Sequence, residues 1–202
     1  MAINKGESSG KSDKDDVTLI ESFKGDSKLV ICGSTWPEDE KLLAQCASAF
    51  PNIKWVIAPH EVGPENVARS GALFPDSQKL SSFSKPRGNV LIVDSIGMLN
   101  RLYRYADVAY VGGAFRTGLH NILEATAFGA PTVFGPDHSR FPDAGEMVQK
   151  ELAFSIRNEK ELLSCFRQLL HQDQTELRAR LLAFMESRTG ATRTIVEYTN
   201  DC

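Results

Sequence analysis

The sequence lacks the short motifs that identify several large classes of nucleotide and metal enzymes. Its first predicted strand is followed by GSTWPE, so the GxGxxG dinucleotide-binding fingerprint is absent, and no GxxxxGK[ST] phosphate loop occurs. HExxH and CxxC are also absent, and no cluster of histidine and acidic residues replaces them. These absences argue against a dinucleotide enzyme of the usual type, a P-loop nucleotide hydrolase and a metal enzyme. We predict no metal site.

Cysteine is scarce, net charge is low, and long apolar runs are missing. The four cysteines have no metal-like spacing, which is typical of ordinary core thiols in a reducing compartment. A formal net charge of -3 argues against general nucleic-acid binding and against a strongly membrane-attracted surface. No apolar segment approaches membrane-span length, and the polar start has no hydrophobic signal region, so we expect this chain by itself to be soluble.

The composition is that of a globular domain, with 202 residues of which 42% are hydrophobic and 24% charged. Residues 1–16 are rich in Gly, Ser, Lys and Asp, which predicts a flexible linker. Residues 17–202 are then expected to form one domain. Its last part, 158–202, shows helical periodicity only.

Short apolar runs alternate with amphipathic segments, which is the pattern of repeated strand-helix units. The predicted strands cover about 29–32, 54–58, 89–93, 108–111, 132–134 and 152–156. The predicted helices between them cover about 38–49, 64–72, 98–105, 119–128 and 143–150. This alternation predicts an α/β fold with a doubly wound, Rossmann-like parallel sheet of about six strands.

The stretch from Asp107 to Pro136 organises this predicted sheet. A short strand ends in Gly112-Gly113, a polar loop follows, and a helix is predicted before the next strand. Strands joined through a helix in this way are parallel, and ligands of such sheets bind beyond the carboxyl ends of the strands. The two glycines let the backbone approach a ligand. Free amides at the helix start, near residues 118–121, would then bind phosphate or carboxylate.

Three polar side chains lie at this predicted helix start. His120 and Asn121 are at the start itself, and Glu124 follows on the same helical face, so all three can point at one ligand. The carboxylate of Glu124 would accept well from two vicinal sugar hydroxyls. Alternatively, Glu124 is a solvated helix residue, and His120 and Asn121 are caps. Spacing alone does not separate these interpretations.

A second strand-to-helix junction carries small hydroxyl residues. Ser34 and Thr35 follow the first predicted strand, where an anion or a base edge could bind. They could equally cap the next helix, which begins with a proline and acidic residues. The second strand also ends in polar residues, at Pro59-His60-Glu61.

Taken together, these segments resemble one known family. The stretches are Gly33-Ser34-Thr35-Trp36, Asp94-Ser95-Ile96-Gly97-Met98-Leu99, residues 103–113, Gly118-Leu119-His120-Asn121-Ile122-Leu123-Glu124 and Phe134-Gly135-Pro136. In this order and spacing they resemble the C-terminal half of the 3-deoxy-D-manno-octulosonic acid (Kdo) transferases, the lipopolysaccharide enzymes of Gram-negative bacteria. The resemblance implies a GT-B fold, in which two Rossmann-like domains face each other across a cleft.

The resemblance implies that residues 17–202 form the donor-binding domain, which in this family binds CMP-Kdo. Ser34 and Thr35 are implied to lie near the phosphate of CMP, and Ile96, Gly97 and Met98 against the cytosine. The residues that match the family's glycine and its phosphate and ribose contacts are Gly113, His120, Asn121 and Glu124. The chain departs from the family at Leu119, where many members have the second glycine of Gly-Gly-His-Asn. It also has Pro59-His60-Glu61 where many members have an Arg-His pair.

The implied reaction is the inverting transfer of Kdo from CMP-Kdo to a hydroxyl of lipid A precursor. A general base must take the proton of the acceptor hydroxyl, and positive charge or backbone amides must stabilise the phosphate of the leaving CMP. In this family the base belongs to the N-terminal domain, which also binds lipid A precursor and is missing here. No catalytic residue is therefore predicted in this chain, although His120 or Arg116 could serve the leaving group.

From this resemblance we expect the chain alone to bind CMP weakly and to transfer nothing. No cofactor is expected, since CMP-Kdo is a substrate, and no nucleic acid partner is expected. The complete enzyme would work at the cytoplasmic face of the bacterial inner membrane, with membrane contact through the missing half.

Two alternatives remain open. Another GT-B enzyme, either a UDP-sugar transferase or a UDP-GlcNAc epimerase, would share the glycine-rich strand end and the ribose-binding glutamate, but it would prefer UDP. A non-catalytic nucleotide-binding module would also have this fold, because a Rossmann-like domain alone implies no chemistry.

Overall fold

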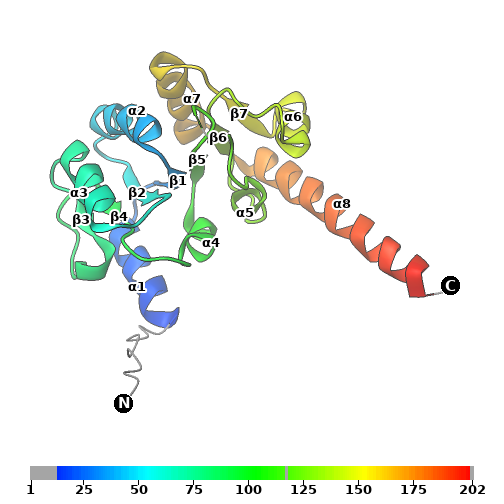
Figure 1. Cartoon of the computed structure of the whole chain (residues 1–202), viewed down its shortest axis with the longest axis horizontal. Helices are drawn as coiled ribbons and strands as arrows, with labels where there is room; N and C mark the ends of the chain where they lie inside the picture. Colours follow the sequence, from blue (N-terminus) through cyan, green and yellow to red (C-terminus); the bar gives the residue numbers. More distant parts are fainter. Residues whose placement is uncertain (1–12, 117, 201–202) are drawn as a thin grey trace, which may run out of the picture.

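A computed structural model describes residues 13–116 and 118–200, with side chains for residues 18–116 and 118–188. Its strands form a seven-stranded sheet in which all neighbours pair in parallel (Figure 1). The strands are β1 (Leu29–Thr35), β2 (Lys54–Pro59), β3 (Gln78–Lys79), β4 (Val90–Ile92), β5 (Val108–Val111), β6 (Thr132–Phe134) and β7 (Ala153–Ser155). Their order across the sheet is β3-β4-β2-β1-β5-β6-β7.

The predicted parallel α/β sheet is confirmed, with one more strand than expected. The additional strand is β3, which pairs with β4 at one edge of the sheet. It has only two residues, one half-buried and one exposed. A strand so short and polar has no apolar periodicity that the sequence could reveal.

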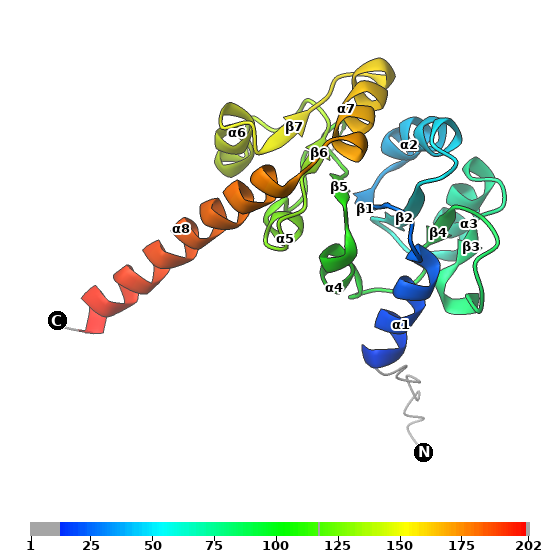
Figure 2. The same ribbon diagram turned by 180° about the vertical axis from the view of Figure 1, so that it is seen from behind.

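Helices cover both faces of the sheet, as a doubly wound fold requires (Figures 1 and 2). They are α1 (Asp13–Lys24), α2 (Pro37–Ala49), α3 (Pro64–Leu73), α4 (Leu99–Leu102), α5 (Leu123–Thr126), α6 (Pro142–Gln149), α7 (Glu159–His171) and α8 (Thr175–Asn200), with 3₁₀ turns η1 (Leu80–Ser82) and η2 (Tyr103–Tyr105). Side chains of α2, α3 and α7 share one apolar core, and those of α1, η2, α5, α6 and α8 share the other.

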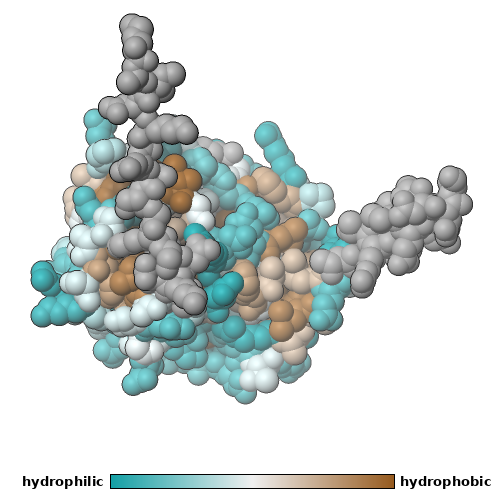
Figure 3. All heavy atoms as spheres, turned by 90° about the horizontal axis from the view of Figure 1, so that it is seen from below, coloured by the Kyte–Doolittle hydropathy of each residue, from teal (hydrophilic) through white to brown (hydrophobic). Residues whose placement is uncertain are grey.

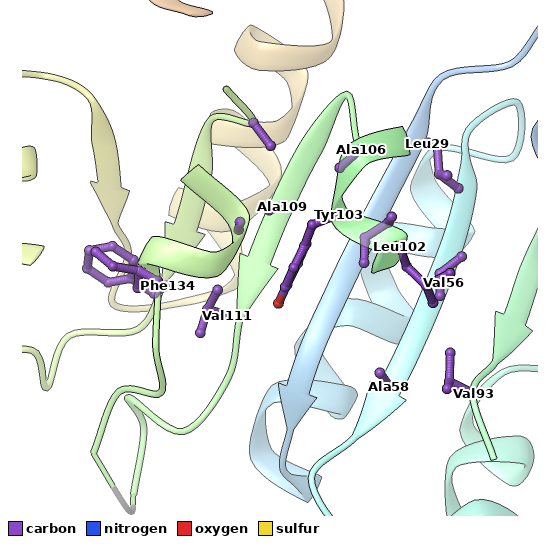
Figure 4. Packing of buried hydrophobic residues seen from close by; sticks show 14 of the residues in the cluster. Leu29, Val56, Ala58, Val93, Leu102, Tyr103, Ala106, Ala109, Val111 and Phe134 are labelled. Atoms are coloured by element: carbon purple, nitrogen blue, oxygen red, sulfur yellow. The ribbon is translucent and has the colours of Figure 1, made fainter. Parts of the chain in front are cut away.

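The alternation of side chains along β1 explains the two cores. Leu29 and Ile31 belong to one core, while Val30 and Cys32 belong to the other, and all four are fully buried. A strand buried on both faces shows a continuous apolar run instead of alternation, which is why this run predicts a strand of a parallel sheet. Figure 4 shows part of the first core, including Tyr103.

Helix α1 begins at Asp13, inside the stretch 1–16 that the sequence predicts to be a linker. Its residues Ile20 and Phe23 are 0% and 1% exposed in the first core, so packing against the sheet holds the helix. The boundary at residue 16 is therefore replaced by a helix start at Asp13. Residues 1–12 lie outside the described residues.

The last helix, α8, extends away from the body of the domain (Figures 1 and 2). Near its start, Arg178 donates to the backbone carbonyls of Ala106 and Asp107, which fixes the helix to the segment before β5. On the face in Figure 3, hydrophobic residues form separate groups among hydrophilic ones. Among the described helices, none is both long and apolar enough to cross a membrane.

Candidate functional site

Three rings from three loops stack at the carboxyl edge of the sheet. Strand β1 lies between β2 and β5, so the loops after these strands are neighbours. The rings of Trp36 and His60 have centroids 4.7 Å apart, and those of His60 and His120 are 4.4 Å apart, with interplanar angles of 23° and 26°. The indole Nε1 of Trp36 donates to Nε2 of His120 at 3.1 Å. We call these residues the ring stack.

The backbone of each residue in the ring stack is fixed to a neighbouring segment. The amide of His60 donates to the Thr35 carbonyl at 2.9 Å, and the amide of His120 donates to the Gly112 carbonyl at 3.3 Å. The amide of Trp36 donates to Asp39. Burial lowers the pKa of His120, and the nearby His60 lowers it further, so His120 favours its neutral form. No role for Trp36 is predicted from the sequence, although its position directly after a central strand could indicate one.

Asp39 joins two of the loops at this edge. The side chain is fully buried, and one carboxylate oxygen accepts from the amides of Trp36 and Gly113 at 2.9 and 3.0 Å. The other oxygen accepts from the hydroxyl of Tyr110 at 2.7 Å. Burial raises the pKa of Asp39, and these hydrogen bonds only partly oppose the rise. Asp39 therefore holds the loop after β1 against the glycine turn after β5.

Glu40 makes a similar connection between the end of β1 and α3. Its two carboxylate oxygens accept from the hydroxyls of Thr35 at 3.0 Å and Ser70 at 2.8 Å. Burial also raises the pKa of Glu40. Thr35 is 2% exposed and its hydroxyl is already donated to Glu40, so the structure places this predicted phosphate contact inside the protein instead of at its surface.

The interpretation of Ser34 and Thr35 as helix caps is wrong. Strand β1 continues through Thr35, and α2 begins at Pro37 with Trp36 as its N-cap residue. The carboxylate of Asp39, the third residue of the helix, accepts from the Trp36 amide, as the acidic residue of a capping box does. Ser34 is half-buried within β1 and has a positive φ of 52°, and it lies at a register shift in the pairing of β1 with β2, between Gly33 and Thr35.

The predicted helix start at residues 118–121 is also wrong. Helix α5 spans only Leu123–Thr126, and the chain before it is an irregular loop. Gly118 has a φ of 95°, and its amide donates to the Gly113 carbonyl at 3.0 Å. The amides of Gly113, Gly118 and His120 are all bonded within the protein, so they do not form the anion site that a helix terminus would provide. The reason is that the loop folds back onto the two glycines after β5.

Asn121 and Glu124 lie together at the start of α5. The Asn121 carbonyl oxygen accepts from the Leu123 amide at 3.1 Å, which agrees with the capping interpretation of Asn121. Its amide group donates to one carboxylate oxygen of Glu124 at 3.2 Å. Glu124 is half-buried, and its charge adds to the rise in the pKa of Tyr103, which burial mainly causes. The carboxylate is thus held in place and still reaches solvent.

The residues predicted to contact a base follow β4. Ile96 is 86% exposed, which is unusual for so large an apolar side chain. Gly97 has a φ of 86°, which turns the chain back into α4, while Met98 is only 8% exposed and packs in the first core. Of these three residues, the structure therefore exposes the side chain of Ile96 and buries that of Met98.

One large cavity lies away from this edge. Its volume is about 720 Å³, and it is lined by the outer strand β7 together with α7 and the start of α8. The ring stack and Glu124 do not line it. Within the described residues, no group of three or more His, Cys, Asp or Glu side chains could hold a metal ion.

The chain is similar in sequence to bacterial glycosyltransferases. It is 33% identical over 157 residues to the 3-deoxy-D-manno-octulosonic acid transferase of Chlamydia trachomatis serovar A, covering 73% of this chain and 36% of that protein. It is 32% identical over 132 residues to the enzyme of the same name from Aquifex aeolicus, covering 64% of this chain and 37% of that protein. The chain thus spans a little over a third of these relatives. No protein-family model matches it.

The structure is also similar to a solved protein domain. The crystal structure of the C-terminal CMP-Kdo binding domain of WaaA from Acinetobacter baumannii matches with a TM-score of 0.71 and 21% sequence identity. The match covers 86% of this chain and 95% of that domain. At this identity the likeness shows the fold, and it confirms the predicted Rossmann-like α/β domain of the GT-B type.

Proposed function

We propose that this chain, which belongs to the Kdo transferase family, is the donor-binding domain of such an enzyme and binds CMP-Kdo. The complete enzyme would transfer Kdo to lipid A precursor with inversion, at the cytoplasmic face of the bacterial inner membrane. The observation that carries this proposal is the sequence relationship, with identities of 32% and 33% to two transferases. The shared fold with a CMP-Kdo binding domain supports it.

The donor would lie across the carboxyl ends of β4, β1 and β5. Glu124 accepts a hydrogen bond from Asn121 on one oxygen, so its remaining acceptor sites are suited to two vicinal ribose hydroxyls. Ile96 offers an exposed apolar surface to the base. Ser34 and His120 lie between these points, at the ends of β1 and of the loop after β5, where the phosphate would bind.

The chemistry of this domain would be the stabilisation of the leaving CMP. A donor N–H aimed at the phosphate stabilises charge that develops as the bond to Kdo breaks. His120 would supply such a donor, and Arg116, which forms an exposed ion pair with Glu38 at 3.4 Å, would add positive charge. The general base and the acceptor site would belong to the other half of the enzyme. The chain alone is therefore expected to bind CMP and to catalyse no transfer.

Replacing Glu124 by alanine is expected to weaken CMP binding by about 1–3 kcal/mol, or roughly 5- to 150-fold, because a charged hydrogen bond to ribose is lost. Calorimetric titration with CMP and with UDP measures this effect. Glu176→Ala is the matched control, since Glu176 is an exposed glutamate in the first turn of α8 and is expected to leave binding unchanged.

The two titrations also separate the alternatives. Preferential binding of CMP supports the proposal, whereas preferential binding of UDP would indicate a GT-B enzyme with a UDP-sugar donor. Unchanged CMP affinity in Glu124→Ala contradicts the role given to Glu124. Transfer of Kdo by the purified chain alone would contradict the assignment of the general base and the acceptor site to the other half of the enzyme.

Replacing Ile96 by serine is expected to weaken CMP binding about fivefold, or by roughly 1 kcal/mol, because apolar contact with the base is lost. The midpoint of thermal unfolding of this variant is expected to stay nearly unchanged. The Ile96 side chain is 86% exposed, and a surface substitution usually changes the free energy of unfolding by less than about 0.5 kcal/mol. Differential scanning fluorimetry and the same CMP titration measure both quantities. Leu182→Ser, at a 44% exposed position on α8, is the control that should leave CMP binding unchanged.

A further inference from the structure

The hydrogen bond between Trp36 and His120 defines where the imidazole proton lies. An indole N–H only donates, so Nε2 of His120 must accept and must carry no proton. A neutral imidazole with an unprotonated Nε2 has its proton on Nδ1. A positively charged imidazole would carry protons on both nitrogens and could not accept from Trp36.

The Nε2 edge of the His120 ring is packed inside the protein. A Cβ atom built on Gly113 would lie 2.8 Å from Cδ2 and 3.2 Å from Nε2 of His120, so this edge of the ring lies against the glycine backbone as well as Trp36. His60 stacks on the ring at 4.4 Å. Nδ1 lies on the opposite side of the ring, and none of the described residues accepts a hydrogen bond from it.

We propose that Trp36 is a positioning residue that holds His120 as a neutral imidazole with its proton on Nδ1, so that His120 meets the phosphate of a bound nucleotide as an N–H donor. The choice of a nucleotide phosphate rests on the proposed function, whereas the position of the proton does not. Three fixed backbones make this arrangement rigid: Asp39 holds the amide of Trp36, and the carbonyls of Thr35 and Gly112 hold those of His60 and His120.

The test is a long-range ¹H–¹⁵N correlation spectrum of the ligand-free chain, labelled with ¹⁵N-histidine, at a pH of about 7.5, above the usual pKa of histidine. The signals of His120 are identified by their loss in His120→Gln. In the wild-type chain, we expect the pattern of a proton on Nδ1. In Trp36→Phe, which keeps an aromatic ring and removes the donor, we expect this pattern to be replaced by an Nε2-protonated or averaged one.

His60→Phe is the matched control, because it keeps a ring beside His120 and leaves the indole donor in place. We expect the His120 pattern to be unchanged in this variant. An Nε2-protonated His120 in the wild-type chain would overturn the proposal, as would an unchanged pattern in folded Trp36→Phe. If Trp36→Phe does not fold, the wild-type spectrum still decides.

A titration with CMP then tests the ligand part separately. CMP binding to the wild-type chain is expected to shift the Nδ1 resonance of His120. Failure of CMP to bind would count against the proposed function while leaving the proton position established by the first spectrum. CMP binding without any shift at His120 would overturn the contact with phosphate.

Discussion

Replacing Gly112 by alanine is expected to lower the free energy of unfolding by about 3 kcal/mol, the cost of a severe overpacking. A Cβ atom at this position would lie 2.4 Å from the carbonyl oxygen of Ser34 and 2.8 Å from both Cα of Thr35 and Oδ2 of Asp39. Two of these atoms are backbone of β1. The Gly112 amide also donates to the Gly33 carbonyl at 2.9 Å, so separating the strands to make room would break the sheet.

Urea unfolding followed by circular dichroism measures this effect. Gly145→Ala is the control, because a Cβ at Gly145 meets nothing within 4 Å. Gly145 lies inside α6, where alanine is expected to be more stable than glycine by about 1 kcal/mol. Equal stability of Gly112→Ala and the wild-type chain would show that the contact between the loops after β1 and β5 is not as close as described.

Replacing Asp39 by alanine is expected to lower the free energy of unfolding by about 3 kcal/mol, because buried donors lose a charged acceptor. The carboxylate accepts from the amides of Trp36 and Gly113 and from the hydroxyl of Tyr110. Each donor left without a partner costs roughly 1–3 kcal/mol, while removal of a buried carboxyl group offsets part of that cost. The same unfolding experiment measures the difference.

A double-mutant cycle with Tyr110→Phe identifies the source of the loss. If the hydroxyl of Tyr110 depends on Asp39, then Asp39→Ala costs less in the Tyr110→Phe background than in the wild-type chain. Asp143→Ala is the surface control, because Asp143 forms an exposed ion pair with Arg188 and is expected to contribute less than about 1 kcal/mol. A loss in Asp39→Ala no larger than this control would contradict the bridging role.

Much of the fold follows from local patterns in the sequence. Runs such as Leu29–Cys32 and Val108–Val111 are buried on both faces and are too short for buried helices, so they predict parallel strands correctly. Gly112 and Gly113 end β5, where the predicted glycine turn lies. The relationship to the Kdo transferases was likewise visible in the order and spacing of motifs, and the sequence comparisons confirm it.

Other features depend on tertiary contacts that no local pattern contains. Asp39 and Glu40 follow a proline and have the appearance of ordinary acids in the first turn of a helix, yet both are fully buried. The partner of Asp39, Tyr110, is 71 residues away in the chain. The start of α5 was predicted too early for a similar reason, since the loop before it is shaped by bonds to Gly112 and Gly113. The ring stack combines residues from three loops, so it cannot be predicted from any single stretch of the sequence.

The pairing of β1 with β5 has a consequence for the way this chain is made. The amide of Leu29 at the start of β1 donates to Asp107, 78 residues later, and the two strands run side by side from there. At a ribosomal rate of about 5–20 residues per second, β5 is synthesised roughly 4–16 s after β1. Until β5 is made, the edge of β1 that pairs with it in the finished sheet has no partner. An unpaired, apolar strand edge is prone to aggregation, so the centre of the sheet is exposed to this risk while the chain is being synthesised.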